Sequence, residues 1–369
     1  MKLETIIGVI VLGVFSVGAF VYFSESQKTT SLSEGKARTG TAPVDGQVSA
    51  KMVFLSKEDR MFKVAPDIST PDGFINTEGK PITISEFKGK KVVLLDIWTY
   101  SCINCQRTIP VLNELHKKYE DDGLVIIGLH TPEFAFERVL KNVEKATNGF
   151  GIKYPVVLDN DFSTWNAYEN RYWPRKYLID IDGYIVYDHA GEGKYPETEL
   201  AIQNALLERG ERLGIKLNTD DWKANMDVSK AATFAQVGSP EIYFGASRNE
   251  YLENGKPGVL GNQTLTIPSS IKLNKLYLGG TWSIDSESSE NKGGGTIVFK
   301  YKAKDIYMVA SGSEGTKIEI SRDGVFVKSL LIEGEELYSI IEGTEHGEHT
   351  LIIKVPAGGT LNAFTFTFG

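Results

Sequence analysis

The sequence predicts an N-terminal transmembrane helix, followed by an α/β domain and then by an all-β domain of the sandwich or jelly-roll type. Three observations predict this order. Residues 6–23 form an unbroken uncharged run, strands and helices alternate over residues 66–210, and from about Ser239 short segments alternate apolar with polar residues between glycine-rich turns. A chain of 369 residues is long enough for two or three domains.

The uncharged run at residues 6–23 has the length of a single membrane span. At a helical rise of about 1.5 Å per residue it just crosses the hydrocarbon core of a bilayer. The run continues past Val17-Gly18-Ala19, where a signal peptidase could cut, so an uncleaved anchor over residues 1–23 is predicted. Residues 24–62 are rich in Ser, Thr, Gly and Lys, which predicts a flexible stalk. The basic residues around the run do not fix its orientation.

Composition excludes several classes of protein. The 40 basic and 48 acidic side chains give a net charge of -8 without a long basic run, so the electrostatic signature of a nucleic-acid-binding protein is missing. The two cysteines, Cys102 and Cys105, are too few for a disulfide-framed scaffold or a four-cysteine zinc site. Their spacing indicates redox chemistry instead.

The α/β domain is expected over residues 63–210, with residues 211–238 as a connector. Short apolar runs rich in β-branched residues predict buried strands, and a strand, a helix and a strand in succession imply a right-handed parallel crossover. A turn at Asp182-Gly183 predicts a closing hairpin. The expected strands are at residues 92–98, 124–129 and 155–159, and the expected helices follow the cysteines and lie at about 134–146, around Trp165 and at 197–209.

The all-β domain is expected over residues 239–369. Its alternating segments and the hairpin turn Arg322-Asp323-Gly324 predict a β-sandwich. Its aromatic side chains could stack on a sugar or on a protein, although aromatic residues in a small sandwich more often belong to the core. The aromatic residues considered are Tyr243, Phe244, Tyr251, Tyr277 and Trp282.

The pair Cys102-Ile103-Asn104-Cys105 lies where the strand ending at Trp98 gives way to a helix. Unpaired N–H groups and the positive end of the helix dipole stabilise a thiolate in a first helical turn. Cys102 is therefore predicted to be the exposed nucleophile. Cys105, one turn later, would attack the mixed disulfide and release the reduced partner.

Three further positions complete the expected site. Asp96 lies within the apolar strand before the cysteines, where burial would raise its pKa toward the range in which it accepts a proton from Cys105. Pro110 would kink the helix that carries the cysteines. Trp173-Pro174 precedes the next strand, which is a place for a cis peptide bond beside an extended substrate.

These residues carry a family resemblance. From residue 65 to about residue 210, the acid, the CINC pair, Pro110 and Trp173-Pro174 resemble, in order and spacing, the TlpA/ResA type of membrane-anchored, extracytoplasmic thioredoxin-like proteins. More narrowly, WTYSCINCQRTIP, GLHTPEFAFE and NRYWPRKYLID resemble the periplasmic C-terminal region of the DipZ type, related to cytochrome c biogenesis. SPEIYFG and the terminal FTFTFG resemble its carbohydrate-module-like β domain. The polytopic electron-transfer domain of that type is absent from this sequence.

The resemblance implies a thioredoxin-like fold and a single-pass protein of the cytoplasmic membrane with its catalytic domain on the extracytoplasmic side. It implies a thiol-disulfide oxidoreductase that acts on thiols or disulfides of exported proteins. A membrane electron-donor protein is a further candidate partner, and the missing polytopic domain leaves the source of electrons open. The cysteine pair itself carries the two electrons, so no dissociable cofactor and no metal are expected. Pro174 would orient the partner's backbone in antiparallel pairing. The expected substrate-binding residues are Trp98, Tyr100, Trp173 and Arg175.

Other readings stay open from the sequence. The cysteines and His189 could bind copper in a delivery protein, although a structural histidine is expected in that strand. A peroxidase is the other enzymatic alternative. A surface binding protein, in which the β domain acts and the cysteine pair is structural, is the non-enzymatic one. The direction of electron flow is open, with analogy to the TlpA type favouring a reductase.

Overall fold

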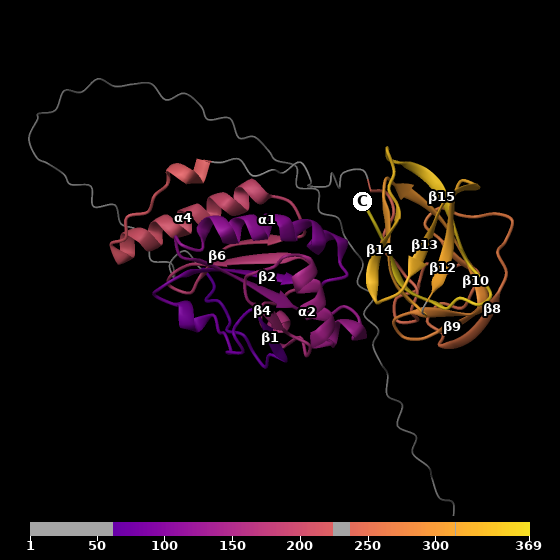
Figure 1. The fold of residues 1–369 in the computed structure, drawn as a ribbon, viewed down its shortest axis with the longest axis horizontal. Coiled ribbons are helices and arrows are strands. Elements are labelled where there is room, and N and C mark those ends of the chain that lie inside the picture. The colour runs from indigo at the N-terminus through magenta and orange to yellow at the C-terminus, as the bar shows by residue number, and fades with distance from the viewer. Residues whose placement is uncertain (1–61, 224–236, 314) are drawn as a thin grey trace, which may run out of the picture. The chain divides into compact units, whose positions relative to one another are not determined.

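The computed structural model describes residues 62–223, 237–313 and 315–369 (Figure 1). The predicted anchor at residues 1–23 and nearly all of the predicted stalk lie outside the described residues, as do residues 224–236 of the predicted connector. Within the described ranges, no helix has the length and apolar character needed to cross a bilayer.

The α/β domain is built on a six-stranded sheet in the order β1-β4-β3-β2-β5-β6. The central strand β2 is parallel to β3 and antiparallel to β5. The strands before and after the cysteines, β2 and β3, form as the sequence predicts because they are continuous apolar runs that are buried on both faces. The strands are β1 (Gly73–Ile75), β2 (Val92–Trp98), β3 (Leu124–His130), β4 (Val156–Leu158), β5 (Arg175–Ile179) and β6 (Ile185–Ala190). This arrangement is a thioredoxin-like fold, as expected.

Among the described residues, four α-helices and three short 3₁₀ helices surround this sheet. They are α1 (Ile103–Tyr119), α2 (Leu140–Gly149), α3 (Ser163–Ala167), α4 (Tyr195–Leu213), η1 (Ser85–Phe87), η2 (Ala135–Arg138) and η3 (Asp220–Lys223). The single helix predicted at about 134–146 is wrong in one respect. It is divided into η2 and α2 at Val139, whose backbone is extended. The buried carboxylate of Glu137 accepts hydrogen bonds from the N–H groups of Glu133 and Phe134, which stabilises the short turn as a separate element.

The sheet separates two apolar cores. Val92, Leu94 and Trp98 of β2 pack in one core with side chains of α1, α2 and α4. Val93 and Leu95 pack in the other core, with side chains from around η1 and from α3. Because side chains alternate along a strand, Asp96 points to the same face as Leu94 and Trp98. Figure 1 shows α1 and α4 running along the same side of the sheet. Asp96 therefore faces the helix that carries the cysteines.

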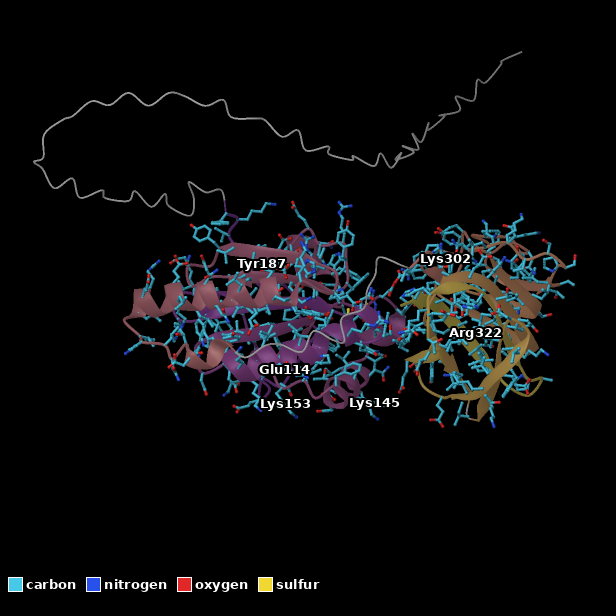
Figure 2. The ribbon with its side chains drawn as sticks, turned by 90° about the horizontal axis from the view of Figure 1, so that it is seen from above. Glu114, Lys145, Lys153, Tyr187, Lys302 and Arg322 are labelled. Carbon is cyan, nitrogen blue, oxygen red and sulfur yellow. The ribbon has the colours of Figure 1, made fainter. Side chains whose placement is uncertain are left out.

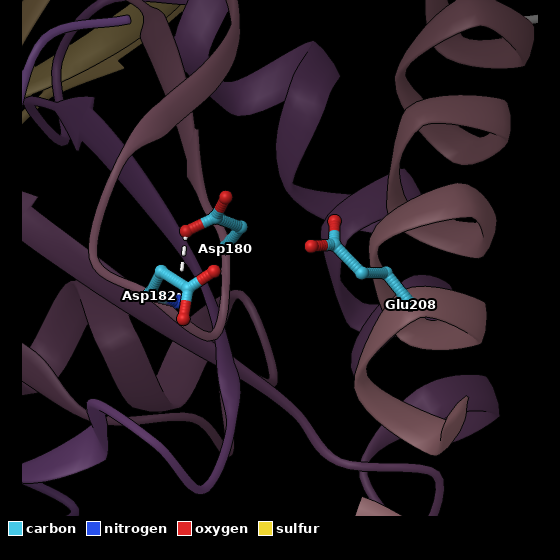
Figure 3. Close-up of side chains that lie close together, drawn as sticks. All are labelled: Asp180, Asp182 and Glu208. Carbon is cyan, nitrogen blue, oxygen red and sulfur yellow. Dashed lines mark hydrogen bonds between the residues drawn. The ribbon is translucent and has the colours of Figure 1, made fainter. Parts of the chain in front are cut away.

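Side chains of Arg212 and Thr198 connect α4 to the β5–β6 hairpin, whose turn is closed by Asp180. The Asp180 carboxylate accepts the N–H groups of Asp182 and Tyr184, each at 2.9 Å, and so closes the turn. Figure 3 shows these aspartates facing Glu208 of α4. Asp182 also accepts two hydrogen bonds from Arg212, both at 2.9 Å. On β6 itself, the Tyr187 hydroxyl lies 3.0 Å from Thr198 Oγ1 of α4.

The C-terminal domain is all-β, as predicted, and encloses its own apolar core. The sequence predicts two stacked sheets, whereas the strand pairings join all ten strands in one network, because the long strand β10 pairs with β9, β15 and β16. Phe244, Tyr277 and Trp282 are core residues. The strands are β7 (Ile242–Tyr243), β8 (Gly261–Leu265), β9 (Leu276–Ile284), β10 (Ser289–Ala303), β11 (Ile306–Gly312), β12 (Thr316–Arg322), β13 (Val325–Ile332), β14 (Glu336–Ile341), β15 (Gly347–Val355) and β16 (Leu361–Phe368).

Candidate functional site

The two cysteines occupy the start of α1 and differ in exposure. Cys102 is the N-cap residue, with extended backbone, and its carbonyl accepts the first helical hydrogen bond from Gln106 N–H at 3.0 Å. Cys105 is one turn further on. Both are free thiols; Cys102 is partly exposed, whereas Cys105 is 1% exposed. A partner protein can therefore reach Cys102 and not Cys105.

Buried polar side chains fix the loop that delivers Cys102. Glu137 accepts hydrogen bonds from the Ser101 hydroxyl at 2.7 Å and from the Ser101 N–H at 3.2 Å. His130 Nε2 accepts the Tyr100 N–H at 3.3 Å, and burial lowers the pKa of His130 to about 3, so the imidazole is neutral. The sequence predicts His130 as a strand-end residue that fixes the loop, but it predicts no role for Glu137. The signal available was an acid inside the apolar segment FAFE.

Asp96 is a buried acid on the face of the sheet that carries the cysteines. It is 2% exposed, and burial raises its pKa to about 7, an effect that the nearby Lys176 ammonium partly offsets. Burial also raises the pKa of Cys105 well above its usual value, and the neighbouring Cys102 and Asp96 add to the effect. Cys105 therefore needs a base to become a nucleophile, and Asp96 is placed to act as one.

Lys176 is a second buried ionisable group that the sequence analysis missed. It lies on β5 directly opposite Asp96 of β2, and its Nζ is 3.9 Å from Asp96 Oδ1. Its side chain is 1% exposed, and burial lowers its pKa. The signal available was a lysine that shares the strand face of the apolar Leu178.

The Trp173-Pro174 peptide bond is cis. The partly buried Trp173 ring is held by a hydrogen bond from its Nε1 to the Thr131 carbonyl at 2.9 Å, and its centroid lies 4.3 Å from that of Trp165. Pro174 has no N–H group, and its carbonyl already accepts the Gly191 N–H at 2.7 Å. Pro174 therefore has no N–H group to offer a substrate backbone, and the pairing expected there stays a prediction.

The expected substrate-binding residues differ in accessibility. Trp98 is wrong as a substrate contact, because it is 1% exposed and its ring packs against His130 and Phe150. Its indole occupies the space where a side chain at Gly128 would be, since a Cβ there would lie 2.9 Å from Trp98 Nε1. Tyr100 lines a cavity of about 340 Å³ together with Gln106, Phe150 and residues 334–337 of the β domain. Arg175 pairs with Asp188 at the rim of the sheet.

A copper site formed by both cysteines and His189 is not assembled. Among the residues that the structure describes, these three do not form a cluster of ligand atoms. His189 Nε2 lies 3.1 Å from the Glu192 carbonyl oxygen instead. His189 therefore has a partner outside the cysteine pair.

Comparison with known proteins agrees with this geometry. Residues 62–188 match the model of the AhpC/TSA family, and residues 239–369 match that of the Thioredoxin like C-terminal domain. Protein DipZ of Mycobacterium tuberculosis is 37% identical over 307 residues, which cover 83% of this chain and 43% of DipZ. The chain thus spans less than half the length of DipZ. Human NHL repeat-containing protein 2 is 36% identical over 58% of this chain and 34% of its own length.

A relative shorter than DipZ is covered more fully by this chain. Thiol-disulfide oxidoreductase ResA of Bacillus cereus is 34% identical over 141 residues, which are 38% of this chain and 76% of ResA. The predicted resemblance is confirmed: this chain belongs to the ResA-type family of thioredoxin-like thiol-disulfide oxidoreductases.

Proposed function

We propose that this chain is a membrane-tethered, extracytoplasmic oxidoreductase that exchanges disulfides with exported proteins through Cys102 and Cys105. The observation that carries the proposal is the unequal exposure of two neighbouring thiols at the start of α1. The accessible Cys102 suits attack on a partner, and the buried Cys105 suits an intramolecular second step.

In the reducing direction, electrons flow from the cysteine pair to the partner. The Cys102 thiolate attacks one sulfur of the partner's disulfide, so a Cys102–partner bond forms and the other partner sulfur leaves as a thiolate. Cys105 then gives its proton to Asp96 and attacks Cys102. The Cys102-Cys105 bond forms, the second partner sulfur leaves, and both partner thiolates take up protons from solvent. Two electrons pass from the cysteine pair to the partner, and an external dithiol restores the pair.

The partner polypeptide would lie along the surface beside Cys102. The Trp173 backbone supplies the pairing that Pro174 cannot, and the indole is fixed by Thr131 and Trp165. Arg175, the first residue of β5, lies two positions after Trp173. The cavity beside Tyr100 offers space for a side chain of the partner. The chemistry needs no dissociable cofactor, because the cysteine pair carries both electrons.

The activity is tested by insulin reduction with the purified full chain. In the presence of dithiothreitol, the chain should accelerate precipitation of the released insulin B chain in proportion to its concentration. The matched control is the variant with both cysteines replaced by serine, which should precipitate insulin no faster than dithiothreitol alone. Equal rates for the wild type and this control would contradict the proposed activity.

The membrane tether rests on the uncharged run at residues 6–23, outside the described residues. The expected result is that the full chain sediments with membranes and resists extraction by alkaline carbonate, whereas a variant lacking residues 1–23 does not sediment. A cysteine-reactive reagent that cannot cross the membrane should label Cys102 in intact cells. Release of the full chain by carbonate would contradict the tether, and protection of Cys102 in intact cells would contradict the extracytoplasmic orientation.

A further inference from the structure

A row of residues crosses the α/β sheet from its centre to its edge. Asp96 of β2 is paired with Gly128 of β3 on one side and with Lys176 of β5 on the other. Lys176 is in turn paired with His189 of the edge strand β6. Residues directly opposite one another point to the same face of a sheet. Asp96, Lys176 and His189 therefore share the face that α1 and α4 cover.

The centre of this row is a buried ion pair with a second acid behind it. The side chains of Asp96 and Lys176 are 3% and 1% exposed, with Nζ and Oδ1 3.9 Å apart. On its other side, Lys176 Nζ lies 3.5 Å from the carbonyl oxygen of Gly191, and the carboxylate of the next residue, Glu192, acts on the Lys176 charge through space. The Glu192 side chain is 2% exposed. Glu192 Oε1 lies 3.5 Å from Arg107 Nη1 of α1. One buried ammonium is thus placed between two buried carboxyl groups, an arrangement that costs desolvation free energy and that packing alone does not require.

The side chains around Asp96 limit the groups with which it can exchange a proton. Toward β3, Gly128 has no side chain, and the rings of Trp98 and Tyr154 fill the space. Burial raises the pKa of Tyr154 well above its usual value, and burial also raises that of Tyr195, so both phenols keep their protons near neutral pH. From α1, Cys105 faces Asp96. Among the described residues, the ionisable groups that can exchange a proton with Asp96 near neutral pH are thus Cys105 and Lys176.

We propose that Asp96, Lys176 and Glu192 form a proton path from Cys105 to the edge of the sheet, in which Lys176 is the positioning residue that sets the charge state of Asp96. The proposal rests on the proposed function, because the proton that travels is the one that Cys105 loses when it attacks Cys102. After that attack, Lys176 gives one proton to Glu192 and receives one from Asp96. Its own proton count is unchanged, and Glu192 releases the proton to solvent at the edge strand.

The charges around the path are consistent with this transfer. Burial raises the pKa of both Asp96 and Glu192 to about 7, so a proton moves between them with little change in free energy. Arg107 and Lys176 face Glu192 and limit the rise in its pKa. His189, beside Glu192, has a pKa lowered chiefly by burial, so its imidazole adds no fixed charge at neutral pH.

The test measures the resolving step alone in the full chain. The reduced protein is mixed rapidly with Ellman's reagent; the first nitrothiobenzoate is released when Cys102 attacks, and the second when Cys105 resolves the mixed disulfide. In wild type the second phase should accelerate as pH rises through about 7, since Asp96 must be ionised to accept the proton. Lys176→Met removes the ammonium that favours the carboxylate, so this midpoint should move upward by about one pH unit or more.

The controls separate a specific effect from a structural one. Lys153→Met removes an exposed lysine and should leave the midpoint unchanged (Figure 2). Glu192→Gln should also move the midpoint upward, but by less than Lys176→Met. The Glu192 carboxylate raises the pKa of Lys176, so without it the Lys176 ammonium loses its proton more readily and favours the Asp96 carboxylate less. In an Asp96→Asn background, Lys176→Met should produce no further shift.

The outcomes decide the proposal. An unchanged midpoint in a folded Lys176→Met variant overturns the proposal. The proposal is also overturned if Lys176→Met shifts the midpoint as much in the Asp96→Asn background as it does in wild type. No shift in Glu192→Gln overturns the part of the path beyond Lys176. If Lys176→Met does not fold, carbon-13 NMR titration of the wild type replaces it: the Asp96 and Glu192 carboxyl resonances must then each show both titration steps. Independent single steps overturn the proposal. A second phase absent from wild type at every pH would instead refute the proposed function.

Discussion

Cys102→Ser is expected to abolish disulfide reduction, with a loss of at least roughly a thousandfold that leaves only the uncatalysed rate. Exchange requires a thiolate as the attacking group, and a serine hydroxyl does not ionise near neutral pH. Cys105 cannot replace Cys102, because it is 1% exposed and lies beneath the first turn of α1. The measurement is insulin reduction under the conditions of the wild-type assay.

Cys105→Ser is the informative counterpart to that variant. It keeps the accessible nucleophile and loses the resolving thiol, so the reaction should stop at the mixed disulfide between Cys102 and the partner. Non-reducing electrophoresis and mass spectrometry should detect this adduct, and dithiothreitol should release it. Adduct formation by Cys102→Ser, or full turnover by Cys105→Ser, would contradict the assigned order of attack.

The exposure of each cysteine follows from helix periodicity, and this part of the site is predictable from sequence. Cys102 caps α1, and Cys105 follows it by almost one helical turn, on the side of the helix that packs on the sheet. The strand β2 is equally predictable, since seven buried residues in succession leave little choice but a central strand. Asp96 inside that strand is conspicuous for the same reason.

The contacts that complete the site depend on pairings between distant parts of the chain. Lys176 meets Asp96 through the register of β5 against β2, and Ser101 meets Glu137 across 36 positions. Neither pairing is encoded in a local pattern. Trp98 could have been placed correctly, because strand alternation puts it on the same buried face as Asp96.

Asp96→Asn is expected to stabilise the folded chain at alkaline pH while slowing the resolving step. The pKa of Asp96 is raised from 3.8 to about 7, so the folded state holds this proton more tightly than the unfolded state does. Such a group contributes stability that is fully present below about pH 4 and is lost as pH rises through about 7. Three units at about 1.4 kcal/mol each give a ceiling of about 4 kcal/mol for that loss.

The gain in the free energy of unfolding of Asp96→Asn should stay below this ceiling, because removing the carboxylate leaves the Lys176 ammonium with Glu192 as its remaining buried counter-charge. Urea unfolding of the full chain at several pH values between 4 and 8 measures this gain. Tryptophan fluorescence follows mainly the α/β domain, since four of the five tryptophans lie there. The difference between the variant and wild type should be small at pH 4 and should grow up to pH 8, whereas the exposed Asp121→Asn should show no such trend. A difference that does not depend on pH would mean that Asp96 is already ionised throughout this range in the folded chain, and it could not then act as the base for Cys105 near neutral pH.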